Sequence, residues 1–248
     1  MRAAWRHAAR NHAASAFAVF VLALASGATL AQTPAMAQET FAPPTERGPV
    51  VIVASGTSGT ELYREFSADL AAQGYYVVLV DGKDVSIRPN DRSRDGAASM
   101  RSLIRDAQAS PRATPGKVAL IGLSLGGIGT LAFGAPLKEQ VSAIVLFYPA
   151  LTRVGSDLTA LSSAMQVPTL VFAGGKDNYR GCCTIETMRA FEAAPKSVSF
   201  QLVVYPEANH AFNLKRVPPP FEYRQADADD ASKRTLEFLA RYQPVAGH

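Results

Sequence analysis

Residues 118–133 read VALIGLSLGGIGTLAF, and the fold prediction starts from this stretch. An unbroken apolar run ends at Ser124, and a glycine-rich turn follows that leads into a helical pattern. Residues 122–126, GLSLG, match the G-x-S-x-G nucleophile elbow, in which a serine occupies a sharp, strained turn between a strand and a helix. The chain comes close to itself on either side of that serine, which explains Gly122 and Gly126. We therefore predict that Ser124 is a nucleophile held between a buried strand and a helix.

Short apolar runs alternate with amphipathic segments along the rest of the chain. Runs rich in Val, Ile and Leu without polar alternation predict strands buried on both faces, at residues 50–54, 75–80, 117–122, 141–148, 168–173 and 198–205. Helical spacing occurs at residues 61–73 after Thr60 as an N-cap, around 97–107, from near Ser124 and Thr184, and over about 227–242. This rhythm predicts the α/β class: a mostly parallel, doubly wound sheet with helices on both faces and no large lid.

The carboxyl ends of such strands are where ligands bind, and three of these ends carry a serine, an aspartate and a histidine in that order. His210 is the only histidine between the N-terminal segment and the last residue, and a serine hydroxyl needs an imidazole to take its proton. We predict that His210 is the general base for Ser124. Asp177 would then orient the imidazole and stabilise the imidazolium. Asp157 and Glu207 are the alternatives for this third position.

The negative charge that develops on the attacked carbonyl oxygen needs two backbone donors. We expect the N–H groups of Leu125, which follows the nucleophile, and of Thr57, in the loop after the first predicted strand, with Ser58 as the second choice. Residues 149–167 and the proline-rich loop 215–224 are expected to border a fairly open site.

The first 37 residues predict a secretory signal peptide, followed by one domain over residues 38–248. Three arginines precede the apolar stretch AFAVFVLALASG, and PAMA, ending at Ala37, offers small residues for cleavage, with Ala31 as an earlier alternative. The apolar stretch is shorter than the roughly 20 residues that span a bilayer, and no cysteine lies near either cleavage position. The sequence therefore predicts a periplasmic or secreted protein without a stable membrane anchor.

Composition limits the partners. The chain has 25 basic and 21 acidic residues, and without the three signal arginines the balance is 22 to 21, which gives no reason to expect nucleic acid. We expect neither a metal nor an organic cofactor. The adjacent Cys182 and Cys183 could form a vicinal disulfide, an intermolecular bridge or no bond at all.

Four stretches resemble the dienelactone hydrolase family of α/β-hydrolases: GLSLGG, GGKDNYRGCC, VVYPEANHAFN and DDASKRTLEFLARY. The resemblance extends from about residue 48 to 242 and implies that Ser124, Asp177 and His210 match the family's triad. Dienelactone hydrolase proper uses a cysteine nucleophile, so Ser124 implies chemistry closer to that of a serine esterase. Its founding enzyme also has an arginine shortly after the histidine, whereas Leu214 lies four residues past His210 here.

The sequence thus predicts a serine hydrolase that cleaves a small-molecule carboxylic ester or lactone through an acyl-enzyme on Ser124. An acyltransferase or a small peptidase would use the same triad and is the alternative within enzymes. A non-catalytic binding protein on a hydrolase fold is the alternative outside them. The oligomeric state is not predicted.

Overall fold

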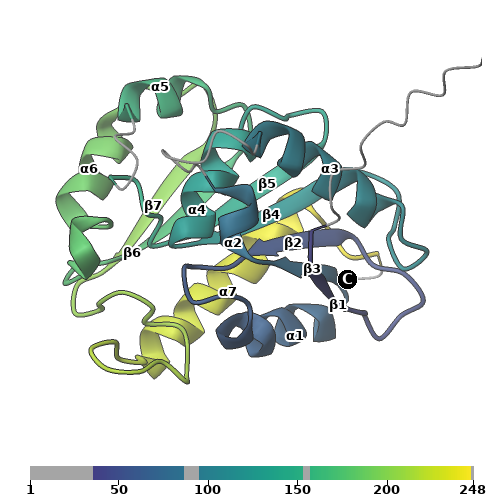
Figure 1. The fold of residues 1–248 in the computed structure, drawn as a ribbon, viewed down its shortest axis with the longest axis horizontal. Helices are drawn as coiled ribbons and strands as arrows, with labels where there is room; N and C mark the ends of the chain where they lie inside the picture. The colour runs from purple at the N-terminus through teal and green to yellow at the C-terminus, as the bar shows by residue number, and fades with distance from the viewer. Residues whose placement is uncertain (1–35, 87–94, 153–156, 247–248) are drawn as a thin grey trace, which may run out of the picture. The chain divides into compact units, whose positions relative to one another are not determined.

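A seven-stranded sheet runs through the molecule in a computed structural model that describes residues 36–86, 95–152 and 157–246 (Figure 1). The strands are β1 Gln38–Phe41, β2 Val50–Ala54, β3 Tyr76–Val80, β4 Val118–Leu123, β5 Val141–Phe147, β6 Thr169–Gly174 and β7 Phe200–Tyr205. Their order in the sheet is β1-β3-β2-β4-β5-β6-β7, and only β1 runs antiparallel to its neighbour. The predicted α/β class with a mostly parallel sheet is confirmed.

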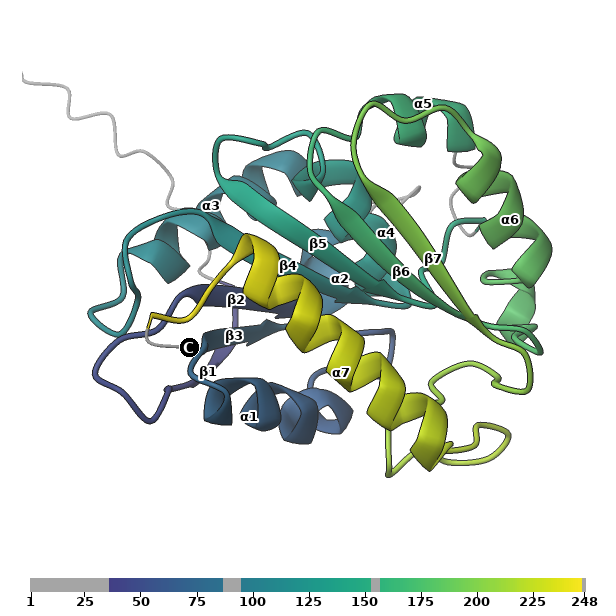
Figure 2. The ribbon, with the colours of Figure 1, turned by 180° about the vertical axis from the view of Figure 1, so that it is seen from behind.

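Helices cover both faces of the sheet. They are α1 Arg64–Ala72, α2 Gly82–Val85, α3 Gly96–Gln108, α4 Leu125–Gly129, α5 Leu158–Ser163, α6 Ile185–Ala193 and α7 Gln225–Tyr242, with short turns η1 Glu61–Tyr63, η2 Thr130–Gly134 and η3 Tyr179–Gly181. α1 and α7 lie on one face and α3, α4 and α6 on the other, as the two opposite views show (Figures 1 and 2).

Alternate strand residues explain this two-sided packing. Val51 and Val53 of β2 belong to the same buried cluster as Phe238 of α7, whereas Ile52 of the same strand belongs to the cluster that contains Leu103 of α3. Because side chains alternate across a strand, a strand that is apolar at every position can fill both layers of core. The sheet therefore holds the carboxyl ends of its strands, and the turns that leave them, on a rigid base.

All six predicted strands are present, with bounds that differ by two residues at most. The predictions missed β1, whose four residues QETF carry a charge and lie at the edge of the sheet, half-buried or exposed. They also missed the short α2 and α5. Between β5 and β6, the described residues contain only α5, so they form no large lid.

Thr60 occupies the predicted N-cap position, at the start of η1, and its carbonyl oxygen accepts from the N–H of Tyr63 at 2.9 Å, but its side chain does not cap the helix. The side-chain hydroxyl donates instead to Glu39 Oε1 of β1 at 2.5 Å. Arg64 Nε donates to the other oxygen of Glu39 at 2.6 Å and holds the pKa of that carboxyl below its ordinary value. A tertiary contact with β1, which the prediction lacked, therefore replaces the local one.

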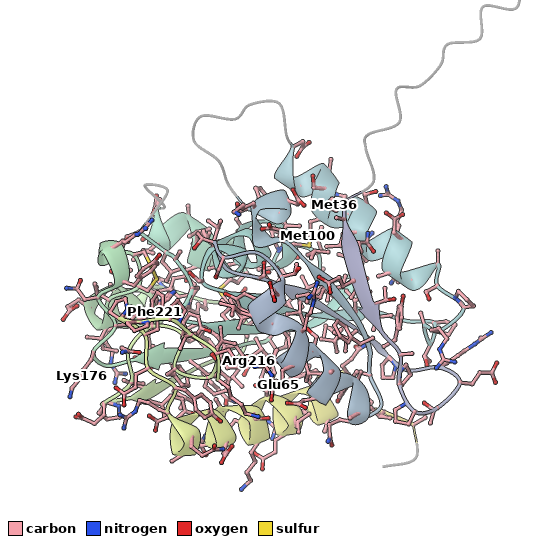
Figure 3. All side chains as sticks on the ribbon, turned by 60° about the horizontal axis from the view of Figure 1, so that its bottom comes forward. Met36, Glu65, Met100, Lys176, Arg216 and Phe221 are labelled. Carbon is pink, nitrogen blue, oxygen red and sulfur yellow. A yellow bond between two sulfur atoms is a disulfide. The ribbon has the colours of Figure 1, made fainter. Side chains whose placement is uncertain are left out.

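The predicted signal peptide falls largely on residues 1–35, which lie outside the described residues. Met36 packs against the core cluster that contains Met100 (Figure 3). Cleavage after Ala37 would remove this contact, whereas cleavage after Ala31 would keep it. No helix in the described part of the chain is long and apolar enough to cross a membrane.

Candidate active site

Ser124 stands at the turn from β4 to α4 with φ +51° and ψ −112°, a backbone conformation that L-residues rarely adopt. Close backbone contacts impose it. A Cβ on Gly126 would lie 2.3 Å from Ala54 O, and a Cβ on Gly122 would lie 2.7 Å from the Cα of Gly127. The N–H of Gly126 also donates to Ser55 O at 3.1 Å, which ties the elbow to the end of β2. The strain at Ser124 is thus held by main-chain packing on both sides.

The structure brings the three predicted triad residues together at the carboxyl ends of β4, β6 and β7. His210 Nε2 lies 3.0 Å from Ser124 Oγ, and His210 Nδ1 lies 2.8 Å from Asp177 Oδ2. In the tautomer with its proton on Nδ1, His210 donates to Asp177 and accepts from the Ser124 hydroxyl, the arrangement that a general base requires. The three residues are only 3 to 5% exposed, so water competes little for these hydrogen bonds.

Neither alternative for the acidic position approaches the histidine. Asp157 is the N-cap of α5, where its Oδ1 accepts from the N–H groups of Thr159 and Ala160 at 2.9 and 3.1 Å. Glu207 forms an exposed ion pair with Lys176. Asp177 is the carboxylate whose geometry suits the role.

Two tyrosine rings enclose the imidazole of His210. The Tyr179 ring stacks on it at 4.8 Å between centroids and 24° between planes, and the Tyr148 ring packs against it at 4.5 Å and 56°. Tyr148 OH donates to Asn213 Oδ1 at 2.7 Å, and complete burial raises the pKa of this phenol well above its ordinary value. The aromatic faces on either side restrict the orientation of the His210 ring.

The two residues predicted to supply the oxyanion donors, Leu125 and Thr57, both lie near Ser124. Leu125 is the first residue of α4, where the N–H has no carbonyl partner within the helix. Thr57 lines the cavity that Ser124 and His210 also line, and so does Ser58. Tyr63 OH is hydrogen-bonded to Gly56 and to Ser58, the two neighbours of Thr57, while burial raises the pKa of this phenol. Tyr63 therefore holds the loop in which Thr57 lies.

The cavity over Ser124 is small, about 120 Å³. Its wall is largely apolar, formed by Leu62, Leu214, Val217, Pro218 and Phe221 together with Tyr63 and Tyr179. The proline-rich loop borders the site as predicted. None of the described residues of the segment 149–167 lines the cavity, and residues 153–156 of that segment lie outside the described residues.

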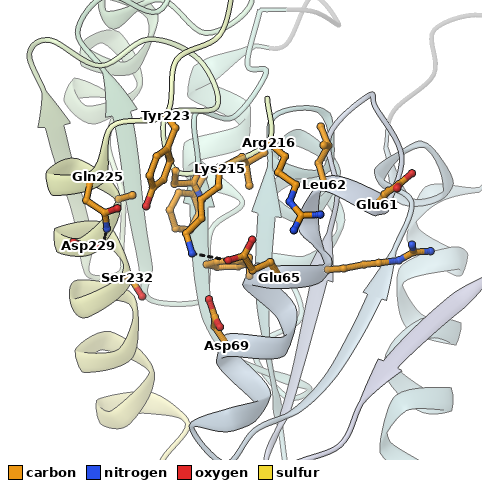
Figure 4. A pocket seen from close by; sticks show the side chains of 16 residues that line it. Glu61, Leu62, Glu65, Asp69, Lys215, Arg216, Tyr223, Gln225, Asp229 and Ser232 are labelled. Carbon is orange, nitrogen blue, oxygen red and sulfur yellow. Dashed lines mark hydrogen bonds and ion pairs between the residues drawn. The ribbon is translucent and has the colours of Figure 1, made fainter. Parts of the chain in front are cut away.

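A larger cavity of about 530 Å³ lies beside the small one, between η1, α1 and α7, and shares Leu62 and Leu214 with it. Its wall is strongly charged: Lys215 Nζ donates to Glu65 Oε1 at 2.5 Å, and Arg216 and Asp69 lie close to the same carboxylate (Figure 4). None of the triad residues lines this cavity. We therefore place the chemistry in the smaller one.

The adjacent cysteines are joined to each other. Cys182 and Cys183 form a vicinal disulfide, which settles the three possibilities that the sequence left open. Their sulfurs and a nitrogen of His210 lie within 4.8 Å of one another, the one group of metal-ligating side chains found within the described residues. Because the sulfurs are bonded to each other, they are not available as thiolate ligands in this state.

Sequence reasoning missed Tyr63, Tyr148 and Tyr179 as residues that support the site. Tyr179 is two residues past Asp177, a spacing that could have placed it near the triad. Tyr63 and Tyr148 carried no comparable signal, because their relation to the site depends on how η1 and the end of β5 pack.

Comparisons with known proteins agree with this architecture. The profile of the dienelactone hydrolase family matches residues 36–243. A candidate carboxymethylenebutenolidase of Escherichia coli (strain K12) is 29% identical over 216 residues, which cover 78% of this chain and 77% of that protein.

Two solved structures share the fold. A candidate dienelactone hydrolase from Klebsiella pneumoniae subsp. pneumoniae has a TM-score of 0.63 at 23% identity, covering 84% of this chain and 100% of that one. Thermogutta terrifontis esterase 2 phosphorylated by paraoxon has a TM-score of 0.62 at 21% identity, covering 85% and 90%.

Proposed function

The chain belongs to the dienelactone hydrolase family of hydrolases, and we propose that it is a serine esterase that cleaves small, uncharged carboxylic esters or lactones through an acyl-enzyme on Ser124. The observation that carries the proposal is the continuous hydrogen-bonded series Asp177–His210–Ser124, with distances of 2.8 and 3.0 Å. It ends at a nucleophile that lines a cavity. Such a series is what converts a weak hydroxyl nucleophile into a reactive one.

The reaction follows from this geometry. His210 Nε2 takes the proton of Ser124 as Oγ attacks the carbonyl carbon, and the N–H groups of Leu125 and Thr57 stabilise the oxyanion. His210 then gives the proton to the leaving alcohol oxygen, which leaves an acyl group on Ser124. A water molecule, deprotonated by the same imidazole, attacks this acyl-enzyme, and the acid is released as Ser124 regains its proton.

The cavity supports the choice of substrate class. Among the described residues that line it, His210 is the only one that can carry a charge near neutral pH, and the remaining wall is apolar or hydroxyl-bearing. A carboxylate on the substrate would have no side chain other than His210, which the reaction needs as a base, to pair with there, and a buried unpaired charge is costly. A volume of about 120 Å³ also favours a short acyl group over a long one. The name of the Escherichia coli relative, carboxymethylenebutenolidase, by contrast refers to a butenolide that carries a carboxyl group.

We also propose that the protein acts in the periplasm or outside the cell, as the predicted signal peptide indicates. The disulfide between Cys182 and Cys183 supports this proposal, because disulfides persist in oxidising compartments.

A fluorophosphonate probe tests the proposal, because it phosphonylates an activated serine Oγ with release of fluoride. We expect labelling of the wild type and none of Ser124→Ala. Ser163→Ala is the matched control, since Ser163 is exposed on α5, and it should be labelled like the wild type. His210→Ala should slow labelling by roughly 10³-fold or more, since the base is lost. An unlabelled wild type, or a Ser124→Ala protein labelled equally well, would overturn the proposal.

A further inference from the structure

The vicinal disulfide lies next to the catalytic imidazole and inside the core. Cys182 and Cys183 are 4 and 0% exposed, and both belong to the apolar cluster on the α3 and α6 face of the sheet. Their sulfurs lie within 4.8 Å of a nitrogen of His210, yet neither residue lines the substrate cavity. The disulfide therefore lies close to the imidazole without forming part of the cavity wall.

The turn that the disulfide closes is the one that orients His210. Asp177 accepts from His210 Nδ1 with Oδ2, and its Oδ1 accepts from the backbone N–H of Tyr179 at 3.0 Å. The ring of Tyr179 stacks on the imidazole. The N–H of Cys182 donates to Tyr179 O at 3.0 Å. One short segment, residues 177–183, thus supplies the carboxylate, the donor that holds the carboxylate, the stacking ring and the disulfide.

The backbone of this segment needs an external restraint. Arg180 has φ +52° and Gly181 has φ +65°, so two consecutive residues adopt the left-handed region, which a non-glycine residue such as Arg180 disfavours. The disulfide closes a small covalent ring directly after them. Thr152 also anchors the turn, because its hydroxyl donates to Gly181 O at 2.7 Å and its N–H donates to Cys182 O at 3.3 Å. Strained turns of this kind persist where covalent and tertiary contacts fix them.

Global stabilisation does not account for this crosslink. A disulfide stabilises chiefly by restricting the unfolded chain, and the effect grows with the length of the loop that it closes. A bond between adjacent residues closes the shortest loop, so its main effect is on the local conformation of residues 179–183.

On the basis of the proposed serine esterase function, we propose that the Cys182–Cys183 disulfide is a positioning element of the active site. In the oxidised form it holds residues 177–183 so that Asp177 and Tyr179 keep His210 aligned with Ser124. A dithiol reductant converts it to two thiols by exchange: its thiolate attacks one sulfur and its second thiol completes the reaction. The cysteines gain two electrons and two protons, and the reductant closes to a cyclic disulfide. The released turn no longer aligns His210, and kcat falls.

The first arm of the test is the Cys182→Ala/Cys183→Ala variant, assayed on a short-chain ester well below its Tm. We expect kcat to fall about tenfold to 100-fold with KM within about twofold, because most of the cavity wall lies outside residues 177–183 while the base is misaligned. A merely structural role would lower Tm and leave kcat unchanged. A variant with a native circular dichroism spectrum and unchanged kcat would overturn the proposal.

The second arm uses the wild type, so it tests the positioning role of the disulfide even if the double variant does not fold. These are the only two cysteines in the chain, so dithiothreitol can act on no other residue. We expect kcat to fall as mass spectrometry after alkylation detects two thiols, and to recover on reoxidation. The double variant serves as the matched control and should not respond to the reductant. Full reduction without loss of kcat would overturn the proposal.

Fluorophosphonate labelling of the same samples separates this proposal from the function on which it rests. An oxidised wild type that is not labelled contradicts the serine esterase function. Labelling at equal rates in the oxidised and reduced protein contradicts only the positioning role of the disulfide.

Discussion

The two halves of the candidate active site are held in place by different means. On the serine side, the elbow between β4 and α4 is fixed by main-chain contacts of Gly122 and Gly126 with the neighbouring backbone. On the histidine side, His210 is held by side chains from distant segments: Asp177 and Tyr179 after β6, and Tyr148 after β5. A nucleophile fixed by the backbone tolerates little change in local sequence, whereas a base fixed by packing depends on the whole fold.

The largest effect is expected from Asp177→Asn, which breaks the histidine side at its polar contact. The amide keeps the shape of the carboxylate but favours the wrong imidazole tautomer, so kcat should fall by roughly 10³–10⁴-fold with little change in Tm. Steady-state kinetics on a short ester would measure this fall. Asp157→Asn is the matched control, because asparagine also caps a helix and Asp157 lies away from the triad. Equal kinetics in the two variants would contradict the assignment of Asp177.

A smaller effect is expected from Gly126→Ala, which breaks the serine side. The added Cβ would lie 2.3 Å from Ala54 O and 2.5 Å from Ser55 O, so the backbone must shift. We expect a loss of about 1–3 kcal/mol in the free energy of unfolding, measured in urea, together with lower kcat. Gly116→Ala is the control: its Cβ meets nothing within 4 Å, but φ is +145°, so it should lower stability without lowering kcat. An unchanged kcat in Gly126→Ala would show that the elbow can relax without moving Ser124.

The smallest effect is expected from Tyr148→Phe, which tests the packing on the histidine side without removing the ring. Loss of the hydrogen bond to Asn213 should cost about 1 kcal/mol of unfolding free energy, because the half-buried amide oxygen loses its donor. The ring that packs on His210 stays, so kcat should change less than about threefold. Tyr75→Phe is the control, since the described residues offer Tyr75 OH no hydrogen bond. A large fall in kcat in Tyr148→Phe would mean that the phenol, and not the ring face, supports the histidine.

The sequence was sufficient for the strands and for the residues of the candidate triad. Buried parallel strands are apolar at nearly every position, so β2 to β7 could be found from their uninterrupted apolar runs. The order of these strands along the chain then placed Ser124, Asp177 and His210 at the carboxyl ends of the strands. Glycines at fixed distances from a serine are likewise a local pattern with a local cause. The edge strand β1 escaped because its four half-buried or exposed residues carry no such pattern.

Tertiary structure alone decided what surrounds the triad. The stacking of Tyr179 and Tyr148 on His210 and the closeness of the disulfide to the imidazole join segments that lie far apart in sequence. Such contacts depend on how turns from different strands pack against one another. The sequence thus determined which groups could react, because backbone geometry and chain order constrain them locally. The fold decided how tightly they are aligned and how small the cavity over Ser124 is, because those depend on packing between distant segments.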